Sequence, residues 1–345
     1  MSLKTKFIIS NSITNAITQI ERTRGFLDAA HLSEEWVQKL QKKALILEAH
    51  HTTHIEGTHL TLEESEQILS GRNVVNADPD DVRELVNYLE AFDLVAEYVT
   101  IGEPITENVI LEIHRRLVSN VRGNAAIPGE YRSIQNYIIN TKTKEIVYLP
   151  PPPQKVSKMM GELVDWLHTE VEIHPVLVAG IAQFQLVHIH PFLDGNGRTA
   201  RLLSTLYLYK MGYDFKRLFT ISEYYDRDRI QYYKAIQSVR DNDMDMTGWL
   251  EYFTTGLATQ LHEIQNRGQK VIRIDILGIE HGLQNREKSA LELSLGKNGF
   301  SVEQYLRQFP ERSKRTLQRD IKRLLDLGLI KAEGSLLHHR YFANF

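Results

Sequence analysis

The chain has 345 residues and a net charge of −3, and its 42% hydrophobic and 25% charged residues exclude a disordered or collagen-like protein. Its length predicts about two domains. No apolar run reaches the roughly 18 residues of a membrane-spanning helix, so we expect no membrane partner, and the N-terminal apolar run is too short for a secretory signal. The lack of cysteine excludes disulfides, thiolate catalysis and cysteine-bound zinc, and it predicts a cytoplasmic protein.

The charge changes sign along the chain. Residues 282–345 contain 12 Lys or Arg against 7 Asp or Glu, a net +5, which leaves −8 for the remainder. Such asymmetry predicts that the two ends of the chain do different work.

Helix signals come first in the chain. Four N-capping residues each precede an apolar repeat spaced by three and four, which predicts helices beginning at Ser33, Thr61, Asp78 and Thr106. Gly57 would end the first of them. Two short β-runs, 136–140 and 145–149, then flank a polar turn and predict a β-hairpin, and the prolines of 150–153 would end its second strand.

Helices resume after these prolines. We expect them over four ranges, 175–190, 197–211, 228–239 and 246–265. A linker would follow at 266–281. The pattern then changes, because residues 282–345 predict three short helices and two strands joined at Gly334. That order is typical of a winged helix-turn-helix domain.

The densest chemical signal lies between two of these helices, in the segment HPFLDGNGRTAR that begins at His190. Two glycines around an asparagine permit positive φ and close approach of a ligand, and a helix N-terminus attracts anions. Arg198 and Arg201 lie three apart and can both lean towards such an anion. Asp194 offers one oxygen ligand to Mg²⁺, and His190 can act as a base near pH 7. These groups together predict phosphoryl or nucleotidyl transfer.

This segment resembles the signature of the Fic family, H-x-F-x-D/E-G-N-G-R-x-x-R, at every specified position. The resemblance implies a mainly α fold, a helical Fic core with a β-hairpin flap. It also implies a nucleotidyltransferase that uses Mg²⁺ and moves AMP from ATP to a Ser, Thr or Tyr hydroxyl of a target protein. The flap would clamp that target as an added strand.

The same resemblance assigns roles to single residues. It implies that His190 is the base, that Asp194 is the metal ligand and that Phe192 anchors the loop. The groups implied to bind the nucleotide phosphates are Gly195, Asn196, Gly197, Arg198 and Arg201. The segment RIQYYKAIQ resembles the family's adenine-pocket helix and points to Tyr232 and Tyr233. Some members carry Asn near the position of Arg240, and some transfer other phosphate-containing groups, so base recognition and donor remain open.

A second motif precedes the signature. Thr52 and Glu56 lie four apart on one helical face, and Glu56 falls in the last turn, where the helix dipole disfavours a carboxylate by about 0.3–1 kcal/mol. This position therefore favours a cationic partner. The stretch TTHIEG resembles the Fic inhibitory pattern S/T-x-x-x-E-G/N. The resemblance implies that Glu56 pairs with Arg201 and keeps the ATP γ-phosphate out of its productive pose.

Two other functions stay open at this point. His50 and His54 lie four apart, a spacing that zinc can use, and with His51, His59 and Asp194 they would suit a metal hydrolase. In the basic tail, a set of polar side chains could face a DNA groove, which would suit a DNA-binding regulator: Arg315, Gln318, Arg319 and Lys322. The tail would otherwise contact protein.

The expected organisation follows from these patterns. We expect an N-terminal helical region with the inhibitory helix at 1–100, a Fic catalytic core at 101–265, a linker at 266–281 and a winged-helix domain at 282–345. The sequence leaves open the identity of the target protein and the oligomeric state, a homodimer included.

Overall fold

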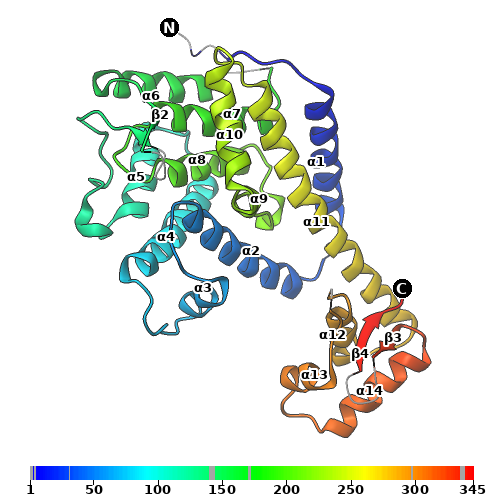
Figure 1. The fold of residues 1–345 in the computed structure, drawn as a ribbon. Helices are drawn as coiled ribbons and strands as arrows, with labels where there is room; N and C mark the ends of the chain where they lie inside the picture. Colours follow the sequence, from blue (N-terminus) through cyan, green and yellow to red (C-terminus); the bar gives the residue numbers. More distant parts are fainter. Residues whose placement is uncertain are drawn as a thin grey trace. The chain divides into compact units, whose positions relative to one another are not determined.

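A computed structural model describes residues 3, 5–30, 32–139, 144–169, 172–296, 298–334 and 339–345. Helices dominate the described chain, which forms two compact units, Met1–Ile264 and Gln265–Phe345 (Figure 1). Among the described residues, no helix has both the length and the apolar character needed to cross a membrane.

The first helices begin at the residues that the sequence predicts. They are α2 (Glu34–Ile55), α3 (Leu62–Leu69), α4 (Pro79–Ile101) and α5 (Glu107–Val118). The side chains of their N-caps each accept a backbone N–H from the first turn: Ser33, Thr61, Asp78 and Thr106. The predicted caps are therefore confirmed.

An earlier helix, α1 (Asn11–Ala29), was not expected. Ser10 caps it by accepting from the Ile13 N–H, and its Oγ also donates to Glu251 over 2.6 Å. The buried face of α1 includes Ile13, Ile20 and Leu27. Its apolar residues are sparse among polar ones, and the helix is stabilised by packing that only the tertiary structure supplies.

The core of the first unit lies around α7 (Pro175–Ile189) and α8 (Asn196–Lys210). Every residue of α7 from Val176 to Val187 is buried, as expected of a helix that is apolar on all sides. The helix α6 (Pro153–His168) packs against α7. The short loop between α7 and α8 is thus fixed at both ends by buried helices, and it carries the HPFLDGNG segment.

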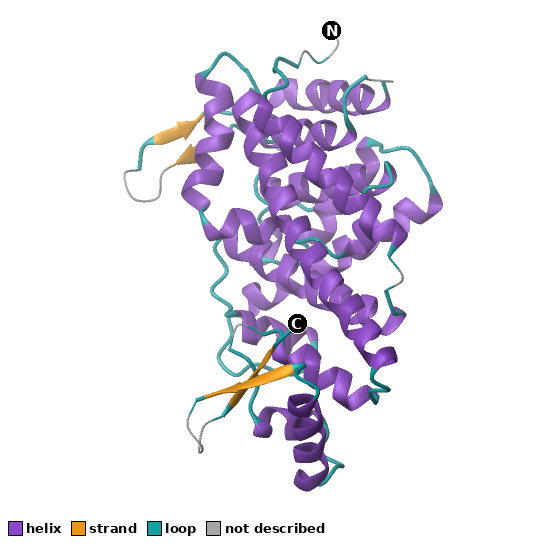
Figure 2. Ribbon diagram, turned by 90° about the vertical axis from the view of Figure 1, so that its right-hand side faces the viewer, coloured by secondary structure: helices purple, strands orange, loops and turns teal. Residues whose placement is uncertain are grey.

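The predicted hairpin is present. Strands β1 (Ile138–Ile139) and β2 (Ile146–Tyr148) pair antiparallel, with a bulge between the first pair and the second. They are shorter than the expected runs 136–140 and 145–149, and Asn140 lies outside the described residues. Figure 2 shows the hairpin projecting from the helices, and Ile139, Ile146 and Val147 are exposed on it. We call residues 134–151 the flap.

After α8 come the helices α9 (Ile221–Arg227), α10 (Arg229–Asp241) and α11 (Thr247–Glu280). The expected linker at 266–281 lies almost wholly within α11, which continues through it as one helix. Val271 and Ile274 extend its buried face, and no proline interrupts it. The helix ends only where Gly282 takes a φ of 58°.

The second unit also contains α12 (Asn285–Ser294), α13 (Val302–Gln308) and α14 (Lys314–Asp326), followed by β3 (Ile330–Glu333) and β4 (Arg340–Ala343). The two strands pair antiparallel. The apolar core of the second unit contains Phe300, Tyr305, Leu317, Ile321, Leu324 and Tyr341. This is the expected order of elements; the identification as a winged helix stays a prediction.

Candidate active site

His190 ends α7 in the left-handed region, with φ 52° and ψ 58°. Its Nδ1 lies 3.3 Å from the carbonyl oxygen of Val187. That bond requires the proton on Nδ1, which leaves the Nε2 lone pair free. Burial lowers the pKa of His190 to about 4. The imidazole is therefore neutral near pH 7 and able to accept a proton.

The loop after His190 is closed by its own side chains. Phe192 is fully buried and stacks on His114 with 3.7 Å between ring centroids. The Asn196 side chain accepts from the Phe192 N–H and donates to the Phe192 carbonyl, each over 2.9 Å. The predicted anchor role of Phe192 fits this burial. The Asn196 amide is already used in shaping the loop, so this residue offers an anion only its backbone N–H.

The two glycines each serve a different need. Gly195 caps α8 with φ 76°, and a Cβ there would lie 2.8 Å from a Val118 methyl carbon. A Cβ on Gly197 would lie 2.3 Å from Oε1 of Glu56. The Glu56 carboxylate thus lies directly against the first turn of α8. N–H groups of a first turn have no partner inside their helix and attract negative charge, so this site already holds an anion.

Glu56 pairs with Arg201, as the inhibitory motif implies. Nη2 of Arg201 lies 2.6 Å from Oε1 of Glu56. Thr52 holds the same guanidinium twice, with Oγ1 2.7 Å from Nε and its carbonyl oxygen 3.1 Å from Nη2. Burial alone would lower the pKa of Arg201, but the Glu56 carboxylate raises it above its ordinary value. Arg201 stays charged and faces the helix α2.

Arg198 is held by a residue that has no place in the motif. Its Nη1 lies 2.7 Å from Oε2 of Glu84 on α4, and both side chains are at most 2% exposed. Arg122 approaches the other Glu84 oxygen over 2.9 Å. Burial raises the pKa of the Glu84 carboxyl, and the two guanidinium groups oppose this rise. The predicted contact of Arg198 with phosphate stays a prediction, since its guanidinium here binds Glu84.

Sequence reasoning missed Glu84, although a signal for it exists. It lies on the stripe that also contains Tyr88, Ala91 and Val95, all buried on α4. A carboxylate in an apolar stripe needs a cationic partner when the helix packs. No comparable pattern marks Arg122.

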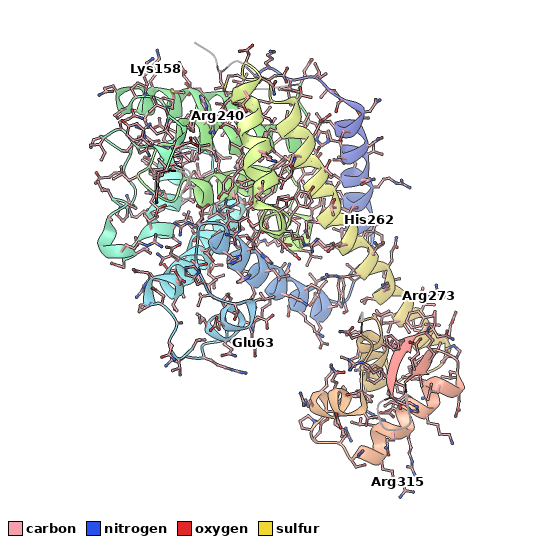
Figure 3. All side chains as sticks on the ribbon, in the orientation of Figure 1. Glu63, Lys158, Arg240, His262, Arg273 and Arg315 are labelled. Carbon is pink, nitrogen blue, oxygen red and sulfur yellow. The ribbon has the colours of Figure 1, made fainter. Side chains whose placement is uncertain are left out.

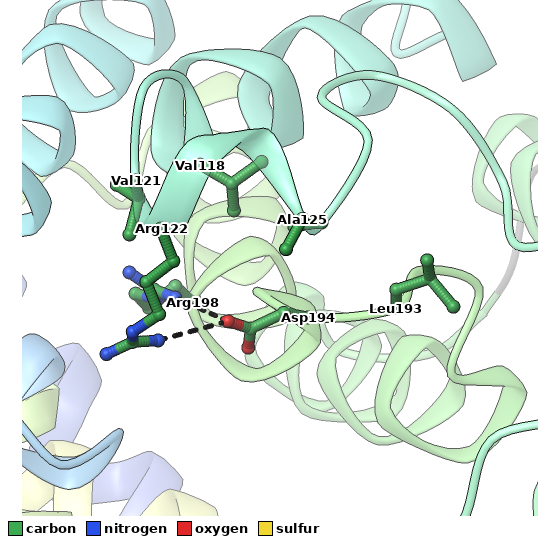
Figure 4. A pocket seen from close by; sticks show the side chains of 8 residues that line it. Val118, Val121, Arg122, Ala125, Leu193, Asp194 and Arg198 are labelled. Carbon is green, nitrogen blue, oxygen red and sulfur yellow. Dashed lines mark ion pairs between the residues drawn. The ribbon is translucent and has the colours of Figure 1, made fainter.

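Asp194 lies at the edge of a cavity of about 210 Å³ whose walls include Val118, Val121, Ala125 and Leu193 (Figure 4). Its side chain is 49% exposed. Oδ1 accepts the Gly195 N–H over 2.6 Å, and Oδ2 lies 3.6 Å from Arg122 and 3.9 Å from Arg198. One accessible carboxylate beside a helix N-terminus suits Mg²⁺, which takes its other ligands from phosphates and water.

This segment lies in a region that is similar to a known family. Residues 104–208 match the Fic/DOC family. His190 through Arg201 fall inside this range, whereas Thr52, Glu56, Tyr232 and Tyr233 lie outside it.

Individual known proteins are similar to a longer part of this chain. Protein adenylyltransferase Fic of Drosophila willistoni is 32% identical over 216 residues, 61% of this chain and 41% of the relative. That of Culex quinquefasciatus is 31% identical over 214 residues, with the same shares. The chain thus spans about two fifths of the length of the curated relatives it matches.

Solved structures show that the Fic fold extends beyond the matched segment. A Fic family protein from Desulfovibrio desulfuricans G20 has a TM-score of 0.67 at 21% identity, over 99% of this chain and 98% of that one. Fic-1 of C. elegans has a TM-score of 0.59 at 23% identity, over 76% of this chain and 73% of that one. The mainly α fold is confirmed.

The two tyrosines expected at an adenine pocket differ in environment. Tyr232 is 2% exposed, and its hydroxyl lies 3.5 Å from Nη1 of Arg201. Tyr233 is 50% exposed. Arg240 lies with its guanidinium carbon 3.4 Å from the ring centroid of Tyr148 on the flap. Outside the matched range, Tyr232 thus contacts Arg201, Tyr233 faces solvent and Arg240 contacts the flap.

Three of the clustered histidines make hydrogen bonds to neighbouring side chains. His51 and His54 each place Nδ1 2.8 Å from Oδ2 of Asp226, and His50 bonds Ser65 over 3.0 Å. His59 is exposed. Within the described ranges, no three His, Asp or Glu side chains are arranged to hold a metal. The metal-hydrolase alternative therefore finds no site among those residues.

Proposed function

We propose that this protein transfers AMP from ATP to a Ser, Thr or Tyr hydroxyl of a target protein, and that Glu56 inhibits the reaction. One observation carries the proposal. A neutral imidazole ends one buried helix, and a carboxylate lies against the first turn of the next helix. The naming of the similar relatives as protein adenylyltransferases supports the same reaction.

The residues divide the chemistry among themselves. Nε2 of His190 takes the proton of the target hydroxyl, and the oxygen then attacks the α-phosphorus. The bond to diphosphate breaks, which gives protein-O-AMP, diphosphate and a protonated imidazole. The N–H groups of the first turn of α8, together with Arg201, stabilise the phosphate charge. Mg²⁺, when bound at Asp194, would neutralise part of that charge.

Glu56 inhibits the transfer because it occupies groups that would otherwise bind the phosphates of ATP. While Glu56 lies against Gly197 and pairs with Arg201, neither group is available to the terminal phosphates of ATP. A nucleotide bound in spite of Glu56 would have to shift its phosphate chain, which moves the α-phosphorus out of line with the attacking oxygen.

The decisive experiment uses the full chain with α-labelled ATP, Mg²⁺ and a cell lysate. Glu56→Gly should raise labelling of protein about tenfold or more, because it frees a charge-assisted contact of the phosphate. Adding His190→Ala to that variant should reduce labelling by about 10²–10⁴-fold with ATP binding kept. Glu63→Gly, which changes an exposed helical glutamate on α3, is the matched control and should leave labelling unchanged.

Two results would contradict the proposal. The inhibitory role of Glu56 fails if Glu56→Gly labels no more protein than the wild type. The role of His190 as base fails if the double variant still labels at the rate of Glu56→Gly.

A second candidate function rests on α14. Leu317, Ile321 and Leu324 are buried, as a recognition helix requires of its inner face. The outer face is exposed and polar, with Arg315, Gln318, Arg319 and Lys322. Figure 3 shows Arg315 extending away from the ribbon. This pattern supports contact of the tail with duplex DNA.

Binding of the full chain to duplex DNA at low and at moderate salt tests this candidate. We expect affinity that falls with salt and that Arg315→Ala with Arg319→Ala weakens. If no complex forms at low salt, a protein partner or a second copy of this chain becomes the better assignment for the tail.

A further inference from the structure

Arg132 lies at the base of the flap and is 3% exposed. Its guanidinium makes three hydrogen bonds among the described residues, and all of them end on backbone carbonyls. Nε donates to His190 over 2.8 Å, Nη1 to Ile134 over 3.2 Å and Nη2 to Pro151 over 2.5 Å. The backbone N–H of Arg132 donates to the Pro191 carbonyl over 2.8 Å.

These four carbonyls belong to two parts of the site. Ile134 and Pro151 are the two ends of the flap, one before β1 and the other after β2. The other two belong to the catalytic loop, one of them to the base His190. A planar guanidinium has its donors in a fixed fork, so it sets the mutual position of everything it binds. Arg132 thus joins both flap ends to the residue that takes the proton.

Neighbouring contacts extend the same junction. Asn136 donates to the Phe192 carbonyl over 3.0 Å, and the Tyr148 hydroxyl lies 2.9 Å from Nδ1 of His188. Each of these joins one point of the flap to one point near the loop. Of the three side chains, Arg132 alone holds both flap ends and the His190 backbone.

The His190 backbone is a place where such support matters. A residue other than glycine with φ 52° is in a sparsely populated conformation that the surroundings must maintain. The Arg132 Nε bond fixes the orientation of the peptide that follows His190. It therefore limits the directions in which the imidazole can point. The charge of Arg132 adds to burial in lowering the pKa of His190.

We propose that Arg132 is a positioning residue that sets the distance between a target segment on the flap and Nε2 of His190. The catalytic part of this inference rests on the proposed function. A target strand that pairs with the flap takes its place from the flap backbone. Because Arg132 ties that backbone to the catalytic loop, it brings the hydroxyl and the base into register. Loss of this register slows the chemical step and leaves nucleotide binding intact.

The test compares Arg132→Lys and Arg132→Met in the Glu56→Gly background. Lysine keeps the charge but has no fork, and methionine keeps neither. Arg24→Met is the control, since Arg24 stacks on Tyr213 at 4.2 Å and contacts neither the flap nor the loop in the contacts described for it. Melting temperatures show that each variant is folded at the assay temperature.

The first measurement, hydrogen exchange of the full chain, needs no enzymatic activity. Both Arg132 variants should speed exchange of the amides in 144–149 and 190–195 about tenfold, with no change in α10 or in the control. Unchanged exchange in both segments overturns the proposal. A general increase, α10 included, also overturns it, since that is the result of mere destabilisation.

The second measurement separates binding from chemistry. Both variants should lower the labelling rate about 100-fold while the Kd for ATP stays within about threefold. A rate equal to that of the parent, or an ATP affinity that falls as far as the rate, overturns the positioning role. If the Glu56→Gly parent itself labels nothing, the proposed function fails, and the exchange result still decides whether Arg132 couples flap and loop.

Discussion

Two arginine–carboxylate pairs hold the first turns of α8, and they differ in one respect. Arg198 pairs with Glu84 over 2.7 Å, and Arg201 pairs with Glu56 over 2.6 Å. Both guanidinium groups are almost fully buried. The Glu84 side chain is 1% exposed, however, and that of Glu56 is 24% exposed. The two ion pairs thus have the same chemistry and nearly the same distance, but their carboxylates differ in exposure to solvent.

The positions of the carboxylates explain this difference. Glu84 lies within α4 and has Arg122 as a second partner, so moving it would leave buried charges unpaired. Glu56 follows the last residue of α2, and Gly57 after it has a φ of 109°. The end of a helix unwinds at a low cost in free energy. Water can then take the place of the partly exposed Glu56 carboxylate. The first pair is suited to permanent support and the second to reversible inhibition.

The largest effect should come from Glu84→Gln. It leaves Arg198 buried without its counter-charge, so the free energy of unfolding should fall by about 3–5 kcal/mol in urea denaturation. A loss below about 1 kcal/mol would mean that this pair is no more structural than an exposed one.

Acidification should destabilise the fold at His114, whose ring stacks on Phe192 in the loop after His190. Burial lowers the pKa of His114 to about 4, so the unfolded chain binds a proton that the folded chain refuses between about pH 6.5 and 4. Stability should therefore fall as the pH is lowered through that window, by about 2 kcal/mol from His114 alone at pH 5. Melting curves at pH 7 and pH 5 measure this loss. His114→Gln should show the smaller difference, and an equal difference would argue against His114 as its source.

Glu56→Gln is the counterpart of the Glu84 variant. Water can replace the partly exposed Glu56 carboxylate beside Arg201, and Thr52 keeps its two bonds to that guanidinium. We therefore expect a smaller loss of unfolding free energy than in Glu84→Gln, together with increased labelling by ATP. The comparison breaks down if this variant loses as much stability as Glu84→Gln. Both variants should be measured in the same buffer, since exposed pairs weaken with salt.

The smallest effect is expected from Thr52→Val. It removes the hydroxyl that lies 2.7 Å from Nε of Arg201 but keeps the Glu56 pair. Labelling should rise about two- to fivefold, less than in Glu56→Gly. The reason is that Thr52→Val removes one hydrogen bond to Arg201, whereas Glu56→Gly removes an ion pair together with its hydrogen bond. A rise as large as that of Glu56→Gly would instead make Thr52 the main inhibitory contact.

The sequence was most informative where function is encoded in consecutive residues. The segment from His190 to Arg201 and the Thr52–Glu56 stretch predict their own helix ends and the pairing that the structure contains. Glu84 and Arg132 were missed because each acts on a segment distant in the chain, at positions with no local pattern of their own. Their roles follow only from packing.

The fold differs from the expectation at residues 266–281 and at α1, and tertiary packing explains both differences. The linker expected at 266–281 is helical because Val271 and Ile274 find a buried place, and burial overrides a weak local pattern. The helix α1 was missed for the same reason. Capping signals, which depend on neighbouring residues only, were correct at Ser33, Thr61, Asp78 and Thr106.

The closed loop around Asn196 has a consequence for mutational scanning. The Asn196 side chain binds the Phe192 backbone at both ends, so this residue can offer a phosphate only its main-chain N–H. Among replacements by natural residues, only proline deletes such a donor. An alanine scan would therefore report a binding site smaller than the real one, and semisynthetic amide-to-ester exchange at Gly197 would reveal the missing part.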